Sequence, residues 1–222
     1  AMFGEAQGWH VDTEAICRGN ERVFELPGLP LPGAHNARNA CAALAAIELL
    51  GLHARPAAAA LRTFRPLTHR LQRLGMQRGV DWIDDSIATT PAASLAALRS
   101  IGDRAATLIL GGFDRGLEWD GFARELATRP PHAVIAQGAN APRILEALSR
   151  AAVRAHVEPA DGLQSAVAHA REVTPPGGVV LLSPGAPSFD SFRDYAERGR
   201  TFAALAGFDS AALGEIEGLG IA

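Results

Sequence analysis

Apolar and polar residues follow one pattern in the first 67 residues and another in the rest of the chain. Residues 8–26 alternate short apolar groups with polar turns, which predicts antiparallel strands on either side of Arg18-Gly19-Asn20. Residues 26–33 are rich in proline and glycine, which blocks regular helix. Alanine and leucine at helical spacing then predict helices over residues 36–50 and 55–63.

From about residue 69 onward, short apolar runs alternate with helical patterns. The predicted strands are residues 80–83, 106–110, 133–136 and 179–182, with a weaker one at 155–157. The predicted helices are residues 92–100, 121–127, 141–151, 162–172 and 191–205. Apolar strands separated by helices are typical of a parallel sheet covered on both faces, so we expect an α/β, Rossmann-like domain. The change in pattern predicts two regions, residues 1–67 and 68–222.

Composition narrows the class of protein. Charged residues make up 20% of the sequence and the net charge is -3, so the composition does not indicate electrostatic attraction to nucleic acid or to an anionic membrane. Cys17 and Cys41 lie in unlike surroundings, as expected of reduced thiols in the cytosol. The chain shows neither a signal peptide at its start nor a run of roughly 20 apolar residues. We expect a cytoplasmic fragment of a longer protein, because Phe3 onward resembles the middle of a domain.

Two polar segments precede the first strand of the predicted parallel sheet. Asn36 and Asn39 lie three residues apart at the start of a predicted helix, where their amides could read an adenine; taken alone, helix capping by Asn is the favoured alternative. His69 and Arg70 follow near the predicted boundary. Arginine can clamp a phosphate or a carboxylate and histidine can donate or accept, although such a pair is more often a solvated linker.

Three further segments each follow a predicted strand, and ligands of parallel sheets gather at the carboxyl ends of strands. In residues 82–91, the two carboxylates Asp84 and Asp85 and several hydroxyls could hold a ribose or an amine, while Thr90 can cap the helix that Pro91 begins. In residues 110–116, paired glycines admit a ligand and Arg115 offers a cation, but a plain turn explains this segment equally well.

The last of these segments, residues 182–192, combines small residues with a helix start. Free backbone N–H groups and Ser188 could bind a carboxylate there, and Tyr195 could add its hydroxyl. The alternative is that Ser188 or Asp190 simply caps the helix. Motifs of other reactions are missing from the sequence: a P-loop, a zinc-type Cys/His pairing, a hydrolase Gly-x-Ser-x-Gly and a dinucleotide Gly-x-Gly-x-x-Gly.

In this order, the segments resemble the Mur ligase family, most closely its MurD-type, glutamate-adding branch. The matching motifs are Gly33-x-His-Asn-x-x-Asn39, His69-Arg70, Asp85-Ser-x-Ala-Thr89, Gly111-Gly-x-x-Arg115, Leu182-Ser-Pro-x-x-x-Ser-x-Asp190 and Glu197-Arg198-Gly199. The resemblance covers nearly the whole chain, and the ordered set is far more specific than any one member.

The resemblance implies an ATP- and magnesium-dependent ligase of peptidoglycan precursor synthesis, which forms an amide bond through an acyl phosphate. Its substrates would be UDP-N-acetylmuramoyl-L-alanine and glutamate, and it would act as a monomer. Residues 1–67 would be the C-terminal part of the central ATPase domain, and residues 68–222 the glutamate-binding domain. The P-loop, the magnesium ligands and the UDP site would lie outside the chain, so the chain alone should be inactive.

The resemblance also implies roles for individual residues. The nucleotide would be bound by Asn36, Asn39, Arg70 and Asp85. The glutamate pocket would be formed by Thr89, Arg115, Ser188, Phe189 and Tyr195. No catalytic residue is assigned, although His69 is a candidate.

Two departures from the family bear on the stereochemistry of the substrate. Enzymes that add D-glutamate usually carry lysine where this chain has Ile87, and Arg115 stands where lysine is frequent. The run Asp-Ser-Ile-x-Thr-Thr-Pro at residues 85–91 fits a branch that adds L-glutamate. We therefore expect L-glutamate, with a D-glutamate ligase and a non-catalytic amino-acid or nucleotide binding module as alternatives. A folate-adding relative is disfavoured by residues 183–202.

Overall fold

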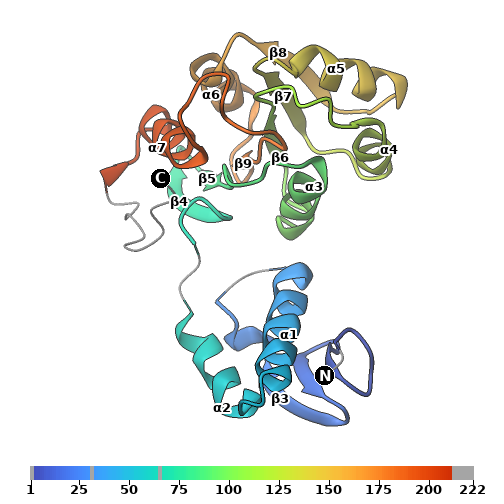
Figure 1. The fold of residues 1–222 in the computed structure, drawn as a ribbon. Coiled ribbons are helices and arrows are strands. Elements are labelled where there is room, and N and C mark those ends of the chain that lie inside the picture. The colour runs from blue at the N-terminus through green and yellow to red at the C-terminus, as the bar shows by residue number, and fades with distance from the viewer. Residues whose placement is uncertain (1–2, 31–32, 65–66, 212–222) are drawn as a thin grey trace. The chain divides into compact units, whose positions relative to one another are not determined.

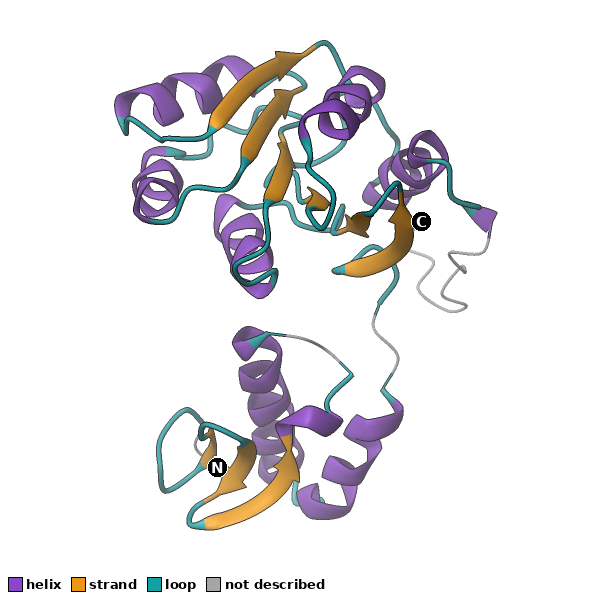
Figure 2. Ribbon diagram, turned by 180° about the vertical axis from the view of Figure 1, so that it is seen from behind, coloured by secondary structure: helices purple, strands orange, loops and turns teal. Residues whose placement is uncertain are grey.

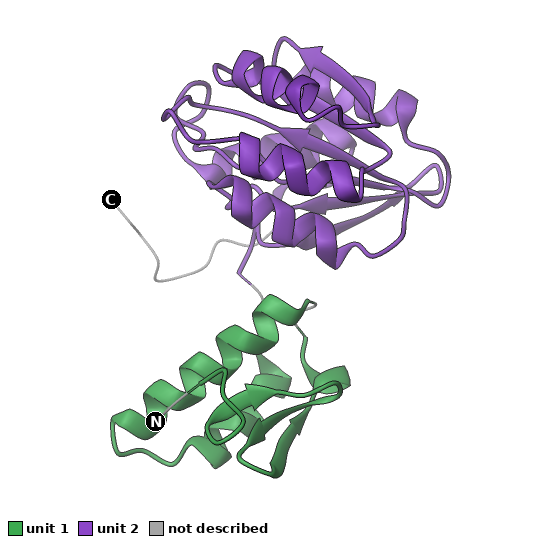
Figure 3. Cartoon of the chain, turned by 90° about the vertical axis from the view of Figure 1, so that its right-hand side faces the viewer, with its two compact units in different colours: residues 1–66 green, residues 67–222 purple. Residues whose placement is uncertain are grey.

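The computed structural model describes residues 3–30, 33–64 and 67–211. The chain divides into two compact units, residues 1–66 and residues 67–222 (Figure 3). Each unit has its own hydrophobic core. The two are therefore described separately.

The first unit is a small antiparallel sheet packed against helices (Figure 1). Its elements are β1 (Trp9–Val11), β2 (Ala15–Arg18), β3 (Glu21–Glu25), η1 (Leu26–Gly28), α1 (Ala34–Leu49), α2 (Ala54–Ala59) and η2 (Ala60–Thr63). The predicted turn between antiparallel strands is confirmed, and Gly19 supplies the positive φ of 59° that it needs. Trp9, Ile16 and Phe24 from the sheet pack on the buried face of α1.

The second unit is built on a six-stranded sheet of order β4-β5-β9-β6-β7-β8. Its strands are β4 (Gln72–Gln77), β5 (Val80–Asp84), β6 (Ala106–Leu110), β7 (Ala133–Gln137), β8 (His156–Ala160) and β9 (Val179–Leu182). All neighbours pair in parallel except β4 and β5, which form an antiparallel hairpin. The edge strand β4 was not predicted, because its residues are mostly polar and half exposed and therefore lack an apolar run.

Helices cover both faces of this sheet (Figure 2). They are α3 (Pro91–Ser100), α4 (Asp120–Thr128), α5 (Ala141–Arg150), α6 (Leu163–Val173) and α7 (Tyr195–Ala206). Successive strand residues face opposite layers, so Leu108 and Leu110 pack with α3, α4 and α5 while Ile109 packs with α6 and α7. The predicted α/β, Rossmann-like class is confirmed.

One helix begins later than the sequence predicted. Helix α7 starts at Tyr195, not at residue 191, because the Asp194 side chain accepts a hydrogen bond from the N–H of Glu197 (2.7 Å) and caps it there. The expectation that Ser188 or Asp190 caps this helix was therefore wrong. Residues 183–194 instead form a long loop after β9.

The order of the sheet places three strand ends side by side. Strand β9 is the last along the chain but pairs between β5 and β6. All three strands run in the same direction, so the loops that follow them leave the same edge of the sheet. We call the segments 85–90, 111–119, 138–140 and 183–194 the carboxyl-edge loops. No helix among the described residues is long and apolar enough to span a membrane.

Candidate functional site

Backbone hydrogen bonds tie the carboxyl-edge loops to one another. Asp85 N–H donates to Leu182 O (2.8 Å), and Gly111 N–H donates to Pro184 O (2.8 Å). Phe113 N–H donates to Pro187 O (2.9 Å), and Asn140 joins from the fourth loop through its N–H to Gly112 O (3.1 Å). Segments that are far apart in the sequence therefore form one surface at this edge of the sheet.

The two acids that end β5 face opposite layers. Asp84 is opposite Leu182 in the register of β5 and β9, and Leu182 packs with α6 and α7. Asp84 accordingly lies beside Gly199 of α7. Asp85 is one residue on and contacts Ser183 instead. Neighbouring carboxylates thus have different partners, which keeps their environments distinct.

Asp85 is a buried carboxyl with two hydrogen-bond donors. Ser183 Oγ donates to Asp85 Oδ2 (2.7 Å), and Leu71 N–H donates to Asp85 Oδ1 (3.1 Å). Burial raises the pKa of Asp85 to about 6; the two hydrogen bonds and Arg70 act in the opposite direction, while Asp84 adds to the rise. Asp85 therefore changes charge close to neutral pH.

Asp84 holds the histidine that the sequence singled out. His69 Nδ1 lies 2.6 Å from Asp84 Oδ2, and both side chains are buried. The other Asp84 oxygen accepts from the Ser86 N–H (2.9 Å). His69 has a positive φ of 64°, an unfavourable conformation for a residue with a side chain, and the buried pair holds it in place.

Arg198 of α7 is a fully buried cation that bridges two of the carboxyl-edge loops. Its Nη2 donates to Ser86 O (2.8 Å) after β5 and to Ala186 O (2.9 Å) after β9. Gly112 approaches it from the third loop: a Cβ there would lie 3.0 Å from Nη1. Burial lowers the pKa of Arg198 to about 10, so it stays protonated at neutral pH. Its Nε and Nη1 have no hydrogen-bond partner among the described residues.

Four of the five residues predicted for a glutamate pocket lie on three of the carboxyl-edge loops, and the fifth, Tyr195, begins α7. Thr89 is half-buried, and the predicted cap by Thr90 is confirmed by its Oγ1 accepting from Ala93 N–H (3.3 Å). Ser188 is buried, whereas Phe189 is 67% exposed. Tyr195 is half-buried at the first position of α7.

Arg115 is exposed on a loop that its neighbour Asp114 fixes. Asp114 Oδ1 accepts from Gly116 N–H (2.8 Å), and Asp114 Oδ2 accepts from Arg143 Nη2 (3.1 Å). These contacts hold the pKa of Asp114 below its usual value. The Arg115 cation is therefore carried by a braced turn.

The predicted nucleotide residues are divided between the two units. Arg70 and Asp85 belong to the second unit, and the Arg70 Nε is buried without a hydrogen-bond partner among the described residues. Asn36 and Asn39 belong to the first unit, where Asn36 is buried and Asn39 is exposed. Capping by Asn36 was a wrong alternative, because Gly33 is the N-cap of α1.

The predicted site residues did not include Asp84, Ser86, Ser183, Arg198 or Asn140, although Asp84 and Ser86 lie in a segment that the sequence marked as a candidate. Arg198 did carry a signal: it precedes Phe202 and Ala206 by four and eight residues, so a charge lies on the apolar face of α7. Asn140 also follows a strand, β7, and its Oδ1 accepts from Gly112 N–H (2.9 Å). Ser183 had no comparable signal, because its partner Asp85 is distant in sequence.

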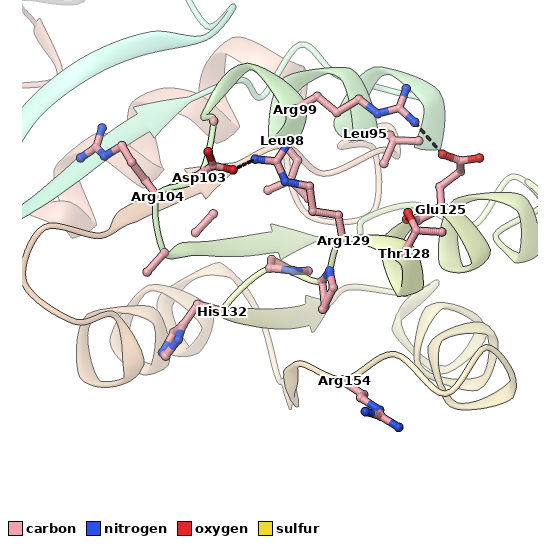
Figure 4. Close-up of a pocket in the computed structure, with 15 residues that line it drawn as sticks. Leu95, Leu98, Arg99, Asp103, Arg104, Glu125, Thr128, Arg129, His132 and Arg154 are labelled. Atoms are coloured by element: carbon pink, nitrogen blue, oxygen red, sulfur yellow. Dashed lines mark hydrogen bonds and ion pairs between the residues drawn. The ribbon is translucent and has the colours of Figure 1, made fainter.

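A cavity of about 720 Å³ lies at the opposite edge of the sheet (Figure 4). Three of the four arginines that line it are paired within the protein: Arg99 with Glu125 (2.6 Å), Arg104 with Asp81 (2.6 Å) and Arg129 with Asp103. None of the predicted site residues lines it. In the described parts of the chain, no group of three or more His, Cys, Asp or Glu side chains is arranged to hold a metal ion.

We predict that Gly199→Ala destabilises the second unit. The new Cβ would collide with His69, Asp84 and Ser86, which are fixed by their own hydrogen bonds, so we expect a loss of about 2–4 kcal/mol in unfolding free energy. The matched control is Gly121→Ala in α4, where a Cβ would meet only the Arg124 side chain, at an ordinary contact distance of 3.9 Å, so this change should be neutral or stabilise by up to ~1 kcal/mol. Urea unfolding measures both, and equal effects would contradict the close packing at Gly199.

We also predict that Asp85 makes stability depend on pH. Its pKa rises from 3.8 to about 6 on folding, so the protonated form stabilises the fold below about pH 4 and this contribution is lost as pH passes through about 6. Asp85→Asn keeps the shape of the protonated acid. The variant should match the unchanged protein at pH 4 and exceed its unfolding free energy by up to ~3 kcal/mol at pH 8. Asp161→Asn, at an exposed position, is the control for the substitution itself, and urea unfolding from pH 4 to 8 compares the two variants.

Comparisons with known proteins show the family of this chain. The sequence model of the family described as Mur ligase, glutamate ligase domain, matches residues 69–185. A protein of Xanthomonas axonopodis pv. citri named UDP-N-acetylmuramoyl-L-alanine--L-glutamate ligase is 49% identical over 222 residues, covering 99% of this chain and 47% of the relative. A protein of Rubrobacter xylanophilus named UDP-N-acetylmuramoylalanine--D-glutamate ligase is 41% identical over 206 residues, covering 93% and 46%.

Solved structures share the fold at low sequence identity. MurF of Acinetobacter baumannii aligns with a TM-score of 0.64 and 18% identity, covering 92% of this chain and 46% of that one. UDP-N-acetylmuramate-alanine ligase MurC of Thermotoga maritima aligns with a TM-score of 0.62 and 20% identity, covering 88% and 45%. The chain spans about half the length of the curated relatives it matches. The family match, the shared fold and the grouped strand ends confirm the resemblance: this chain belongs to the Mur ligase family.

Proposed function

We propose that the chain is the glutamate-binding part of an ATP-dependent ligase that joins glutamate to UDP-N-acetylmuramoyl-L-alanine. The observation that carries this proposal is the grouping of Asp85, Arg115 and Ser188 on neighbouring carboxyl-edge loops. The names of relatives at 41–49% identity support the glutamate ligase assignment. The acyl phosphate intermediate belongs to the same proposal, and magnesium would be held by residues outside this chain.

We propose a different role for each of the two units. Residues 1–67 would be the C-terminal part of the central ATPase domain, with Asn36 and Asn39 near the adenine. Arg70 and Asp85 would meet the ribose or the phosphates. A buried guanidinium Nε without a partner and a carboxylate that titrates near neutral pH are groups that a polar nucleotide can satisfy.

The glutamate pocket would use groups suited to a dicarboxylate. Arg115 offers an exposed guanidinium, and Ser188, Thr89 and Tyr195 offer hydroxyl groups. Phe189 would add an exposed apolar surface beside them. These groups would orient the amine of glutamate for attack on the activated carboxyl, which is catalysis by positioning.

His69 fits a positioning role better than proton transfer to substrate. Its side chain is 4% exposed and its Nδ1 is engaged by Asp84. The pair anchors the segment that carries Arg70. We therefore propose that His69 orients Arg70 and does not itself react.

We further propose that the amino acid is L-glutamate. Ile87 is half-buried and cannot supply the cation that enzymes adding D-glutamate usually have there. The relatives at 47–49% identity are named as L-glutamate ligases, whereas the one at 41% is named for D-glutamate.

The experiment that tests the function offers each glutamate enantiomer to the intact ligase with ATP and UDP-N-acetylmuramoyl-L-alanine. We expect L-glutamate to be used at least about tenfold more efficiently, a difference of ~1.4 kcal/mol in transition-state binding. Phosphate release and product mass are measured together. Efficient use of D-glutamate alone would reverse the stereochemical assignment, and no product with either enantiomer would refute the ligase function.

We predict that Arg115→Ala in the intact ligase raises the KM for glutamate about 10- to 100-fold, the equivalent of one charge-assisted hydrogen bond. The KM for ATP should change little, because the cation would face the amino acid. Arg154→Ala is the matched control: Arg154 is exposed before β8, at the opposite edge of the sheet. Equal rises in both KM values would count against the pocket assignment.

A further inference from the structure

We propose that Ser183 is a positioning residue that holds the Asp85 carboxylate for nucleotide binding and couples it to the loop that carries Ser188. The inference rests on the proposed function, because it takes Asp85 as a nucleotide contact. Ser183 itself would touch no substrate.

Strand register puts Ser183 beside Asp85. Asp84 and Leu182 are partners in the parallel pairing of β5 and β9, so the next residues of the two strands are neighbours on the other face of the sheet. Ser183 Oγ donates to Asp85 Oδ2 over 2.7 Å, and both side chains are buried. A hydroxyl donor at this distance favours the ionised form of the acid.

The backbone of Ser183 is fixed on both sides. Its N–H donates to Ile109 O (3.3 Å), and its carbonyl accepts from Ser94 Oγ of α3 (2.6 Å). Ser183 is fully buried, so no solvent competes for its hydroxyl. The Ser183 side chain therefore starts from a constrained backbone, and its hydroxyl contacts the Asp85 carboxylate, as expected of a group that orients another.

Other charges around Asp85 act in opposite directions. Asp84 precedes it along the chain and raises its pKa, while Arg70 lowers it. His69 contacts Asp84, and Arg198 of α7 reaches the Ser86 carbonyl. The effects of these charges on the Asp85 pKa thus oppose one another. Among the interactions that lower this pKa, the hydrogen bond from Ser183 has the largest effect.

The loop of Ser183 also connects the two halves of the proposed site. Residues 183–188 include Pro184 and Pro187, whose carbonyls accept from Gly111 N–H and Phe113 N–H in the loop of Arg115. The same loop carries the buried Ser188. Its hydrogen bonds therefore join the Asp85 side of the proposed site to the side that carries Ser188 and Arg115, which gives the amino acid a physical connection to the nucleotide side.

Ser183→Ala tests the inference, with Ser94→Ala as the matched control. Ser94 is also a fully buried serine, and its hydroxyl contacts the Ser183 carbonyl but not Asp85. The first measurement is the carboxyl titration of Asp85 by ¹³C NMR in the 222-residue chain, assigned with Asp85→Asn. We expect the pKa to rise by about one unit in Ser183→Ala, the value of a hydrogen bond to a charged group. Ser94→Ala loosens the Ser183 backbone but leaves its hydroxyl in place, so the Asp85 pKa should rise by clearly less than in Ser183→Ala.

The second measurement is the pH dependence of kcat/KM for ATP in the intact ligase. Its acid limb should move up by about one pH unit in Ser183→Ala, as the Asp85 pKa does. At high pH, where Asp85 is ionised in either protein, a remaining rise in the KM for ATP reports lost orientation. The KM for UDP-N-acetylmuramoyl-L-alanine should stay unchanged. Ser183→Cys, which keeps a weak donor, should fall between the two proteins.

The outcomes separate this inference from the proposed function. An Asp85 titration that is the same in Ser183→Ala and the unchanged chain would overturn the inference. Loss of kcat with every KM and the acid limb unchanged would also overturn it, since that is the signature of a purely structural serine. A third outcome is that the Asp85 titration shifts in Ser183→Ala while the KM for ATP stays constant at all pH values. This result would refute both the nucleotide contact of Asp85 and its coupling to the loop of Ser188. An inactive unchanged ligase would refute the proposed function alone.

Discussion

The pairing of β9 between β5 and β6 is the constraint on which the rest of the second unit depends. The chain completes β5, β6, β7 and β8 before this strand is made, yet its hydrogen bonds fill the centre of the sheet. Each neighbour contributes a loop at the same edge. The site is therefore assembled by long-range strand pairing, and no single segment contains it.

Buried polar groups stabilise the carboxyl edge of the sheet through hydrogen bonds between its loops and neighbouring elements. The His69–Asp84 pair, the Ser183–Asp85 bond and the Arg198 guanidinium all lie within the protein, where an unpaired group would cost about 1–3 kcal/mol or more. Each links the end of β5 to another element. Removal of one partner of such a pair leaves the other buried and unpaired, at that energetic cost. The carboxyl edge is therefore rigid and sensitive to substitution.

Much of this architecture was predictable from the sequence, because apolar periodicity reports burial directly. Strands at residues 106–110 and 179–182 have the predicted bounds, and the polar loops after them were recognised as candidates. The polar edge strand β4 and the start of α7 at Tyr195 were not, since an edge strand lacks an apolar signal and the Asp194 cap outweighs helical spacing. The partners of Asp84 and Asp85 depend on register between β5 and β9, which local pattern does not specify.

The turn that carries Arg115 has a consequence for ligand affinity. Asp114 fastens this turn to Gly116 on one side and to Arg143 of α5 on the other, so the backbone beneath the guanidinium is already ordered. Capture of an anion by Arg115, as proposed, would order only the Arg115 side chain, and most of the entropy cost of ordering a flexible loop would be avoided. Asp114, a negative residue next to the cation, would in this way tighten the hold on a negative ligand.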